Sequence, residues 1–138
     1  MDADAADAKV SILLVDDQPS RLLTYESILS GLGQNLVSAR SGLEALDKLM
    51  RQEFAVVLLD VSMPDMDGFE AARLIHEHPR FEKTPIIFVT AFPDEAIRAR
   101  VLKAGACGFL TKPFSDESLI ECLDKALLNG WIDPASQS

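Results

Sequence analysis

Five polar residues in this sequence have side chains suited to binding a metal ion or a phosphate group. They are Asp16, Asp17, Asp60, Thr90 and Lys112, and each lies at the end of a short apolar run. The four runs are Ile12–Val15, Val56–Leu59, Ile86–Val89 and Cys107–Leu110. Continuous apolar runs of this length are typical of strands buried on both faces of a parallel sheet, which binds ligands at the carboxyl ends of its strands. We therefore expect the five side chains to converge on one edge of a sheet.

The types of these residues favour phosphoryl chemistry. Three carboxylates that lie close together stay ionised only beside a cation, and oxygen ligands with few protein donors suit Mg²⁺, for which Mn²⁺ can substitute. Lys112 and the Thr90 hydroxyl provide a clamp for an anion. A metal ion and a lysine would neutralise phosphoryl oxygens while the Asp60 carboxylate attacks, so the expected product is an aspartyl phosphate on Asp60.

Each of these residues also has an ordinary structural explanation when it is taken alone. Asp16 or Asp17 could cap a helix, Thr90 could simply end a strand, and Lys112 could be a solvated surface lysine. The presence of five complementary residues at four strand ends favours a functional site over these explanations.

Helical patterns between the apolar runs give a strand–helix order repeated five times, which predicts an α/β fold with right-handed crossovers. We expect a flavodoxin-like (βα)5 doubly wound sandwich whose five-stranded parallel sheet has the order 2-1-3-4-5. This order places the first and third strands side by side. The pattern predicts a weaker strand at Leu36–Ala39 and helices from Pro19 to about Gly31, Gly42–Gln52, Asp67–His78, Pro93 to Gly105, and after an N-cap at Ser115.

Length and charge exclude several classes of protein. The chain of 138 residues fits one domain, expected at residues 10–128 between an N-terminal tail at 1–9 and a C-terminal tail or linker at 129–138. Its net charge of −9 and its lack of a basic cluster argue against nucleic-acid binding. The segment Met1–Ala8 lacks the features of a signal peptide, and no apolar run reaches membrane-spanning length, so we expect a cytoplasmic protein without a membrane partner.

The cysteines and histidines do not suggest a second site. Cys107 and Cys122 have neither metal-site spacing nor a disulfide framework, so we interpret them as buried structural thiols. His76 and His78 stand two positions apart on an expected helix, where their side chains point in different directions and cannot both bind one ion.

Four motifs carry a resemblance to a known family. They are Ile12-Leu13-Leu14-Val15-Asp16-Asp17, Leu59-Asp60-Val61-Ser62-Met63-Pro64-Asp65-Met66-Asp67-Gly68, Val89-Thr90-Ala91 and Leu110-Thr111-Lys112-Pro113-Phe114. Together they closely resemble the receiver domains of bacterial two-component response regulators, over roughly Val10 to Leu128. The resemblance implies that Asp60 accepts a phosphoryl group from the phosphohistidine of a sensor histidine kinase or a phosphotransfer protein.

The same resemblance implies a ligand set for Mg²⁺. Asp17 and Asp60 would bind the ion directly, the backbone carbonyl of Ser62 would complete the protein ligands, and Asp16 would act chiefly through a metal-bound water.

It also implies how the phosphoryl group is held. Thr90, the backbone of Ala91 and Lys112 would bind its oxygens. The peptide bond between Lys112 and Pro113 would be cis and would aim the lysine at the phosphate.

Signalling by such a domain would rest on a switch rather than on turnover of an external substrate. Thr90 would move toward the phosphate and Phe109 would rotate into the vacated space, which changes the surface of the fourth helix, fifth strand and fifth helix. The domain would be regulatory, not an enzyme, although it would promote its own phosphorylation and dephosphorylation. The changed surface would act on a downstream partner or an output domain, and dimerisation through the same surface is left open.

Phe92 is large and apolar, and we hypothesise that it slows hydrolysis of the aspartyl phosphate.

Two alternatives compete with this interpretation. A pseudo-receiver would dock partners without being phosphorylated, although every expected site residue is present. A magnesium phosphatase with an aspartate nucleophile would usually carry a second aspartate two residues later, where this sequence has Ser62.

Overall fold

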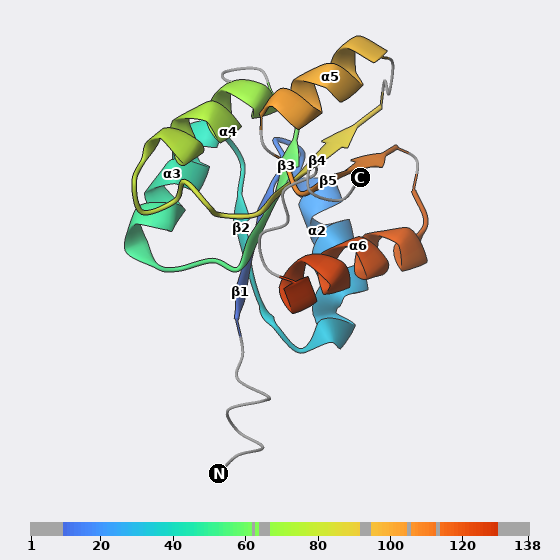
Figure 1. Cartoon of the computed structure of the whole chain (residues 1–138). Helices are drawn as coiled ribbons and strands as arrows, with labels where there is room; N and C mark the ends of the chain where they lie inside the picture. The colour runs from blue at the N-terminus through green and yellow to red at the C-terminus, as the bar shows by residue number, and fades with distance from the viewer. Residues whose placement is uncertain are drawn as a thin grey trace.

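A computed structural model describes residues 10–61, 63, 67–91, 95–104, 106–112 and 114–129. It contains a five-stranded parallel sheet in the order β2-β1-β3-β4-β5, which confirms the predicted topology (Figure 1). The strands are β1 (Ser11–Val15), β2 (Asn35–Ala39), β3 (Val56–Asp60), β4 (Ile86–Thr90) and β5 (Gly108–Thr111). The helices are α2 (Pro19–Leu29), α3 (Gly42–Arg51), α4 (Gly68–Glu77), α5 (Glu95–Lys103) and α6 (Asp116–Asn129), with a short 3₁₀ helix at Ser30–Leu32.

The register of the sheet sets the positions of the functional residues. Val15 pairs with Leu59, and Asp60 and Thr90 are the last residues of their strands, where they pair with Val89 and Thr111. The strands therefore end at one level, which we call the carboxyl edge of the sheet. The edge at which they begin is called the amino edge.

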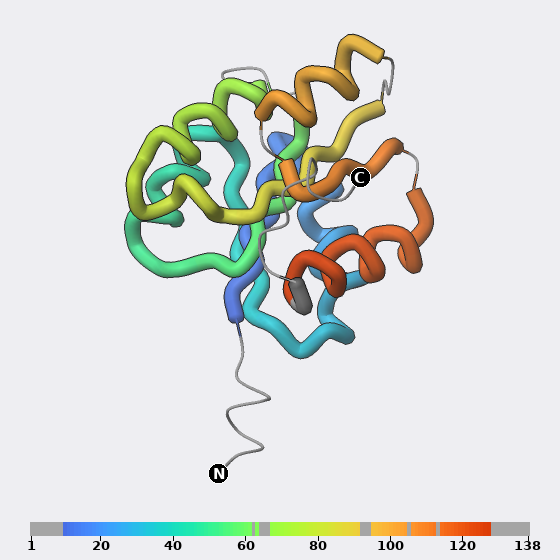
Figure 2. The backbone as a smooth tube through the Cα atoms, in the orientation of Figure 1, coloured from blue at the N-terminus to red at the C-terminus, as the bar shows by residue number. Residues whose placement is uncertain are grey.

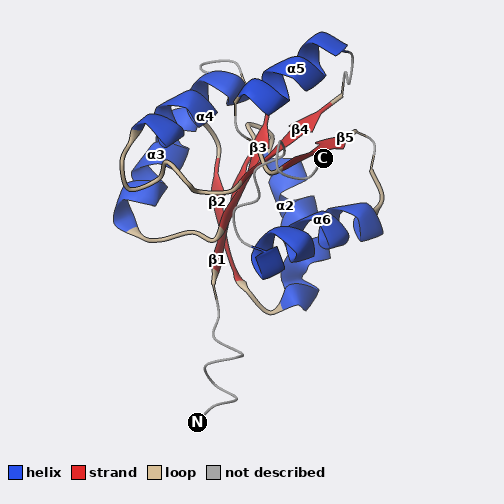
Figure 3. Cartoon of the chain, viewed as in Figure 1, coloured by secondary structure: helices blue, strands red, loops and turns tan. Residues whose placement is uncertain are grey.

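Helices cover both faces of the sheet, as the continuous apolar strands require. In Figures 1 and 3, α3, α4 and α5 lie on one face, and α2 and α6 lie on the other. Alternate strand residues point to opposite faces, so the core divides into two clusters. Phe88 packs with the α3–α5 layer, and Ile87 packs with the α2 and α6 layer.

Side-chain caps fix where several helices begin. Ser41 accepts a hydrogen bond from the Glu44 amide at 3.0 Å, and Asp67 caps α4 in the same way through the Glu70 amide at 2.8 Å. Ser115 accepts from the Ser118 amide at 3.0 Å, which confirms the predicted cap of α6.

Some predicted boundaries were wrong. β5 begins at Gly108, so Cys107 precedes the strand rather than lying inside it. α4 ends at Glu77, because His78 has an extended backbone with ψ of 127°. The expected start of a helix at Pro93 and its end at Gly105 lie outside the described residues; the described helix there is Glu95–Lys103.

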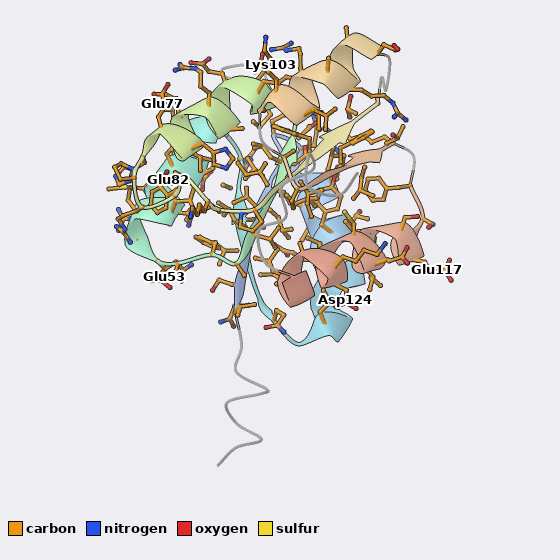
Figure 4. All side chains as sticks on the ribbon, viewed as in Figure 1. Glu53, Glu77, Glu82, Lys103, Glu117 and Asp124 are labelled. Carbon is orange, nitrogen blue, oxygen red and sulfur yellow. The ribbon has the colours of Figure 1, made fainter. Side chains whose placement is uncertain are left out.

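The first described strand and the last described helix both have an end at the amino edge. β1 starts there, and α6 runs back toward it from the carboxyl edge (Figure 2). Charged side chains on the helices and loops point outward from the body, including Glu77, Lys103, Glu117 and Asp124 (Figure 4). Among the helices of the described residues, none is long and apolar enough to cross a membrane.

Candidate functional site

Three carboxylates meet at the carboxyl edge. One oxygen atom from each of Asp16, Asp17 and Asp60 lies within 4.8 Å of the others. Asp16 is fully buried and Asp60 is 2% exposed, whereas Asp17 is only partly buried. The Asp16 amide donates to the Ala39 carbonyl at 3.1 Å, so the connection after β1 is held against the end of β2. The predicted convergence of these three residues is confirmed.

Asp60 lies between two cations. Lys112 Nζ is 3.4 Å from Asp60 Oδ1, and an Arg21 guanidinium nitrogen is 3.4 Å from Asp60 Oδ2. Lys112 is positioned by its backbone, whose amide donates to the Thr90 carbonyl at 2.7 Å. The two cations offset the cost of burying the Asp60 carboxylate and restrict the orientation of its two oxygens.

Asp16 is held by three neighbours. Its Oδ1 accepts a hydrogen bond from the Gln18 amide at 2.9 Å, and its Oδ2 accepts one from Arg21 Nε at 2.8 Å. The Tyr25 hydroxyl lies 3.5 Å from the same Oδ2. Burial, followed by the charge of Asp16, raises the pKa of Tyr25, so its hydroxyl keeps its proton and donates to the carboxylate. Tyr25 also stacks on Phe114, with ring centroids 6.1 Å apart, and thus connects Asp16 to the segment after Lys112.

The residues present fit a divalent cation. Asp17 Oδ1 is shielded from solvent and accepts no hydrogen bond from any described residue; Arg21 is 3.7 Å away. A shielded carboxylate oxygen that accepts no hydrogen bond is costly, and a metal ion would satisfy it. Three carboxylates without nitrogen or sulfur ligands are the donor set that suits Mg²⁺.

The predicted phosphate-binding residues Thr90 and Ala91 lie at the carboxyl end of β4, which pairs with the strand that ends at Asp60. Thr90 is 4% exposed at the end of β4, and Ala91 follows it at an exposed position. Phe109 is half-buried on β5, where it pairs with Phe88, and the Arg98 guanidinium lies 5.4 Å from the centre of its ring. Arg98 comes from α5, so a cation from a neighbouring helix lies over the predicted switch residue.

Gly68 allows α4 to begin directly behind Asp60. A Cβ atom at Gly68 would lie 2.4 Å from the Asp60 carbonyl oxygen and 2.9 Å from Val61 Cα. The Gly68 amide donates to the Val61 carbonyl at 2.9 Å. This position thus requires glycine because the two backbones approach too closely for a side chain.

Several predicted residues lie outside the described part of the chain. These are Ser62 with its proposed carbonyl ligand, Pro113 with the proposed cis bond, Phe92, and the segment 64–66.

The thiols are less buried than we expected. Cys107 and Cys122 are both free and both half-buried. Burial raises the pKa of the Cys107 thiol to about 11 and also raises the pKa of Cys122. They flank the β5–α6 contact, and a Cβ at Gly108 would lie 3.7 Å from Cys122 Sγ.

The two histidines have separate partners. His76 Nε2 lies 2.9 Å from the Thr84 carbonyl oxygen, and the His78 ring stacks on Phe81 with centroids 4.7 Å apart.

The sequence interpretation missed Arg21 and Tyr25. Both lie on α2 and face Asp16, at five and nine positions after it. Arg21 follows Asp17 by four residues, but Asp17 precedes α2, so the helical spacing rule does not apply to this pair. The sequence thus offered no firm signal for Arg21, and it gave Tyr25 no role at the site.

This fold and this arrangement of side chains define a family. Residues 12–124 match the family model of the response regulator receiver domain, and the chain belongs to that family. Receiver domains are regulatory components of two-component systems.

Particular relatives agree with this assignment. The chain is 42% identical over 118 residues to the transcriptional regulatory protein GltR of Pseudomonas aeruginosa. The aligned region covers 86% of this chain and 48% of the relative. The chain is 34% identical over 116 residues to the signal transduction histidine-protein kinase BarA of Escherichia coli, covering 84% of this chain and 13% of the relative. The chain thus spans less than half the length of these relatives.

Two solved structures are similar throughout their length. Chemotaxis protein CheY4 of Vibrio cholerae superposes with a TM-score of 0.81 at 32% identity, covering 86% of this chain and 98% of that one. The receiver domain of sensor histidine kinase PA1611 from Pseudomonas aeruginosa superposes with a TM-score of 0.79 at 32% identity, covering 87% and 98%. The latter structure holds a magnesium ion coordinated in its active-site cleft.

Proposed function

We propose that this domain accepts a phosphoryl group on Asp60 from a sensor histidine kinase or a phosphotransfer protein in a Mg²⁺-dependent reaction. The observation that carries the proposal is the buried Asp60 carboxylate, which lies between Lys112 and Arg21 and beside two further carboxylates. Mn²⁺ would substitute for Mg²⁺, because both ions accept oxygen ligands.

In the proposed transfer, a carboxylate oxygen of Asp60 forms a bond to phosphorus while the phosphorus–nitrogen bond of the donor phosphohistidine breaks. The imidazole leaves with the electron pair of that bond and takes up a proton. Lys112, already 3.4 Å from Asp60, stabilises the charge on the phosphoryl oxygens, and the Thr90 hydroxyl and the Ala91 backbone donate to them.

The bound metal would supply charge neutralisation of the phosphoryl group. Asp17 and Asp60 would be its direct side-chain ligands, together with the backbone carbonyl of Ser62. Asp16, held by Arg21 and the Gln18 amide, would orient a metal-bound water.

Phosphorylation would then shift the equilibrium between two conformations. Thr90 would bind the phosphoryl group and Phe109 would rotate inward, away from Arg98, which lies over its ring at 5.4 Å. A ligand shifts such an equilibrium only through contacts that differ between the two states. The surface of α5, β5 and α6 would report the change to a partner or an output domain, and would be the face of any homodimer.

The remaining features follow from the same proposal. Residues 10–128 form the receiver domain, and the flanking residues are tails or linkers. The domain acts in the cytoplasm without contacting nucleic acid, and it promotes loss of its own phosphoryl group, which Phe92 slows. Replacing Phe92 by Glu would therefore be expected to accelerate the decay of the phosphorylated protein.

The test is the intact mass after incubation with acetyl phosphate, with and without MgCl₂, compared with Asp60→Asn. We expect a metal-dependent gain of one phosphoryl group that is absent from the variant. If neither acetyl phosphate nor phosphorylated histidine kinases modify the protein, the proposal fails and the pseudo-receiver alternative is favoured.

A further inference from the structure

Arg21 contacts all three carboxylates of the acidic cluster. It lies in the first turns of α2, four residues after Asp17 and five after Asp16. Its Nε donates to Asp16 Oδ2 at 2.8 Å, and one terminal nitrogen lies 3.7 Å from Asp17 Oδ1 and 3.4 Å from Asp60 Oδ2. The hydrogen bond to Asp16 raises the pKa of Arg21, so its charge is fixed at all physiological pH values.

We propose that Arg21 is an internal counter-ion that competes with a divalent cation for Asp17 and Asp60, and so sets the metal affinity of the site. This inference rests on the proposed function, because it concerns the same Mg²⁺ site.

The two ends of the guanidinium group are held differently. The bond from Nε to Asp16 is short and anchors the side chain to a fully buried carboxylate. The terminal nitrogen makes a long contact with Asp60 and, at 3.7 Å from Asp17, lies beyond hydrogen-bond distance. Arg21 is 41% exposed, so this end can turn toward solvent without opening the core. The anchored end can stay in place while the terminal nitrogen releases the two proposed metal ligands.

A metal ion and this terminal nitrogen cannot use the same oxygens. A divalent cation that binds both Asp17 and Asp60 would place two positive charges within a few ångströms of the guanidinium, and like charges at such distances repel. The metal must therefore displace the terminal nitrogen, and the free energy of that displacement is lost from metal binding.

Two opposite effects follow from this competition. Without metal, Arg21 offsets repulsion among the carboxylates, so removing its charge should lower thermal stability. With metal, the same removal should strengthen binding. A residue that merely orients Asp16 for metal binding would weaken metal binding when removed, so the sign of the change in affinity distinguishes the two roles.

The experiment is calorimetric titration of the full chain with MgCl₂ at low ionic strength, combined with thermal unfolding in EDTA. Arg21→Gln is compared with the wild type and with the matched control Arg51→Gln. Arg51 lies at the far end of α3, is 73% exposed, and pairs with Asp47 at 3.0 Å, so the control removes the same charge and one ion pair outside the site.

We expect Arg21→Gln to bind Mg²⁺ about three- to tenfold more tightly than the wild type and to unfold at a lower temperature in EDTA. Arg51→Gln should change the affinity less than about twofold, because it is an exposed and distant charge. If Arg21→Gln does not fold, Arg21→Met provides the same test: it keeps a long side chain but removes the positive charge, so its Mg²⁺ affinity should also exceed that of the wild type.

Unchanged or weaker Mg²⁺ binding by the folded Arg21 variant would overturn the inference while leaving the proposed function intact, provided that the wild type binds Mg²⁺. If neither the wild type nor the variant binds Mg²⁺, both the metal assignment and this inference are wrong.

Discussion

Asp17→Asn should stabilise the protein in the absence of metal. At an effective dielectric constant of about 20, carboxylate oxygens up to 4.8 Å apart repel by at least about 3.5 kcal/mol per pair, and Asp17 faces two such neighbours. The attraction between Asp17 and Arg21 at 3.7 Å offsets about 4.5 kcal/mol of this repulsion. The negative charge of Asp17 therefore destabilises the folded protein by about 2.5 kcal/mol. Because this side chain is 24% exposed and therefore screened, we expect a gain of about 1–2 kcal/mol in the free energy of unfolding.

Magnesium should reverse this order of stability. A ligand at one hundred times its dissociation constant stabilises the folded wild type by about 2.7 kcal/mol, whereas the variant lacks a proposed metal ligand and should gain little. The assay is urea unfolding of both proteins in EDTA and in MgCl₂, with Asp47→Asn on α3 as the control. Asp47 is 56% exposed and pairs with Arg51 at 3.0 Å on the surface of α3, so its effect should stay within about 0.5 kcal/mol in both buffers. A variant that is less stable than the wild type in EDTA, or that gains as much from MgCl₂, would refute the electrostatic reasoning.

Three further predictions concern other parts of the site. Gly68→Ala should cost about 1–3 kcal/mol of stability in urea unfolding and slow phosphorylation, because its Cβ would lie 2.4 Å from the Asp60 carbonyl oxygen; Gly31→Ala, with no atom within 4 Å, is the control and should be nearly neutral. Lys112→Met should slow phosphorylation by acetyl phosphate about a hundredfold while calorimetry still detects Mg²⁺ binding, because Asp60 Oδ1 loses its cation but the acidic cluster remains; equal rates would contradict the assigned role. Stability should fall as the pH rises from 9 to about 11, because an unfolded Cys107 thiol ionises near pH 9 whereas the folded one keeps its proton until about pH 11; Cys107→Ala should reduce that decline by about 1–2 kcal/mol, and parallel pH profiles would show that this thiol is not responsible.

The architecture could be predicted because its signals are local and repeated. Four apolar runs predicted the buried strands, and the polar residues after them predicted which side chains lie at the carboxyl edge. Parallel strands end at a common edge. Once the strand order placed β1 beside β3, the convergence of Asp16, Asp17 and Asp60 could be predicted.

Contacts that depend on side-chain reach were harder to predict. Arg21 is a helix residue whose contacts depend on the direction of a long side chain toward carboxylates at the ends of two strands. The position of Arg98 over Phe109 likewise depends on how α5 packs beside β5. Such contacts arise from tertiary packing, which the periodicity of one segment does not specify.

Boundaries failed where hydrophobicity was the only signal. Cys107 belongs to an apolar run but precedes β5. We placed it inside the strand because hydrophobicity alone does not mark where the hydrogen-bonded pairing of strands begins. Helix boundaries marked by a capping side chain, such as Ser115, were predicted more accurately because a specific hydrogen bond defines them.

The amino edge, where β1 starts and α6 ends, has a consequence for how this unit can be combined with others. Every proposed reacting group lies at the opposite edge, one strand length away. A segment joined directly to the start of β1 or to the end of α6 would thus attach on the side remote from the proposed chemistry, where the attachment would not by itself obstruct a phosphoryl donor.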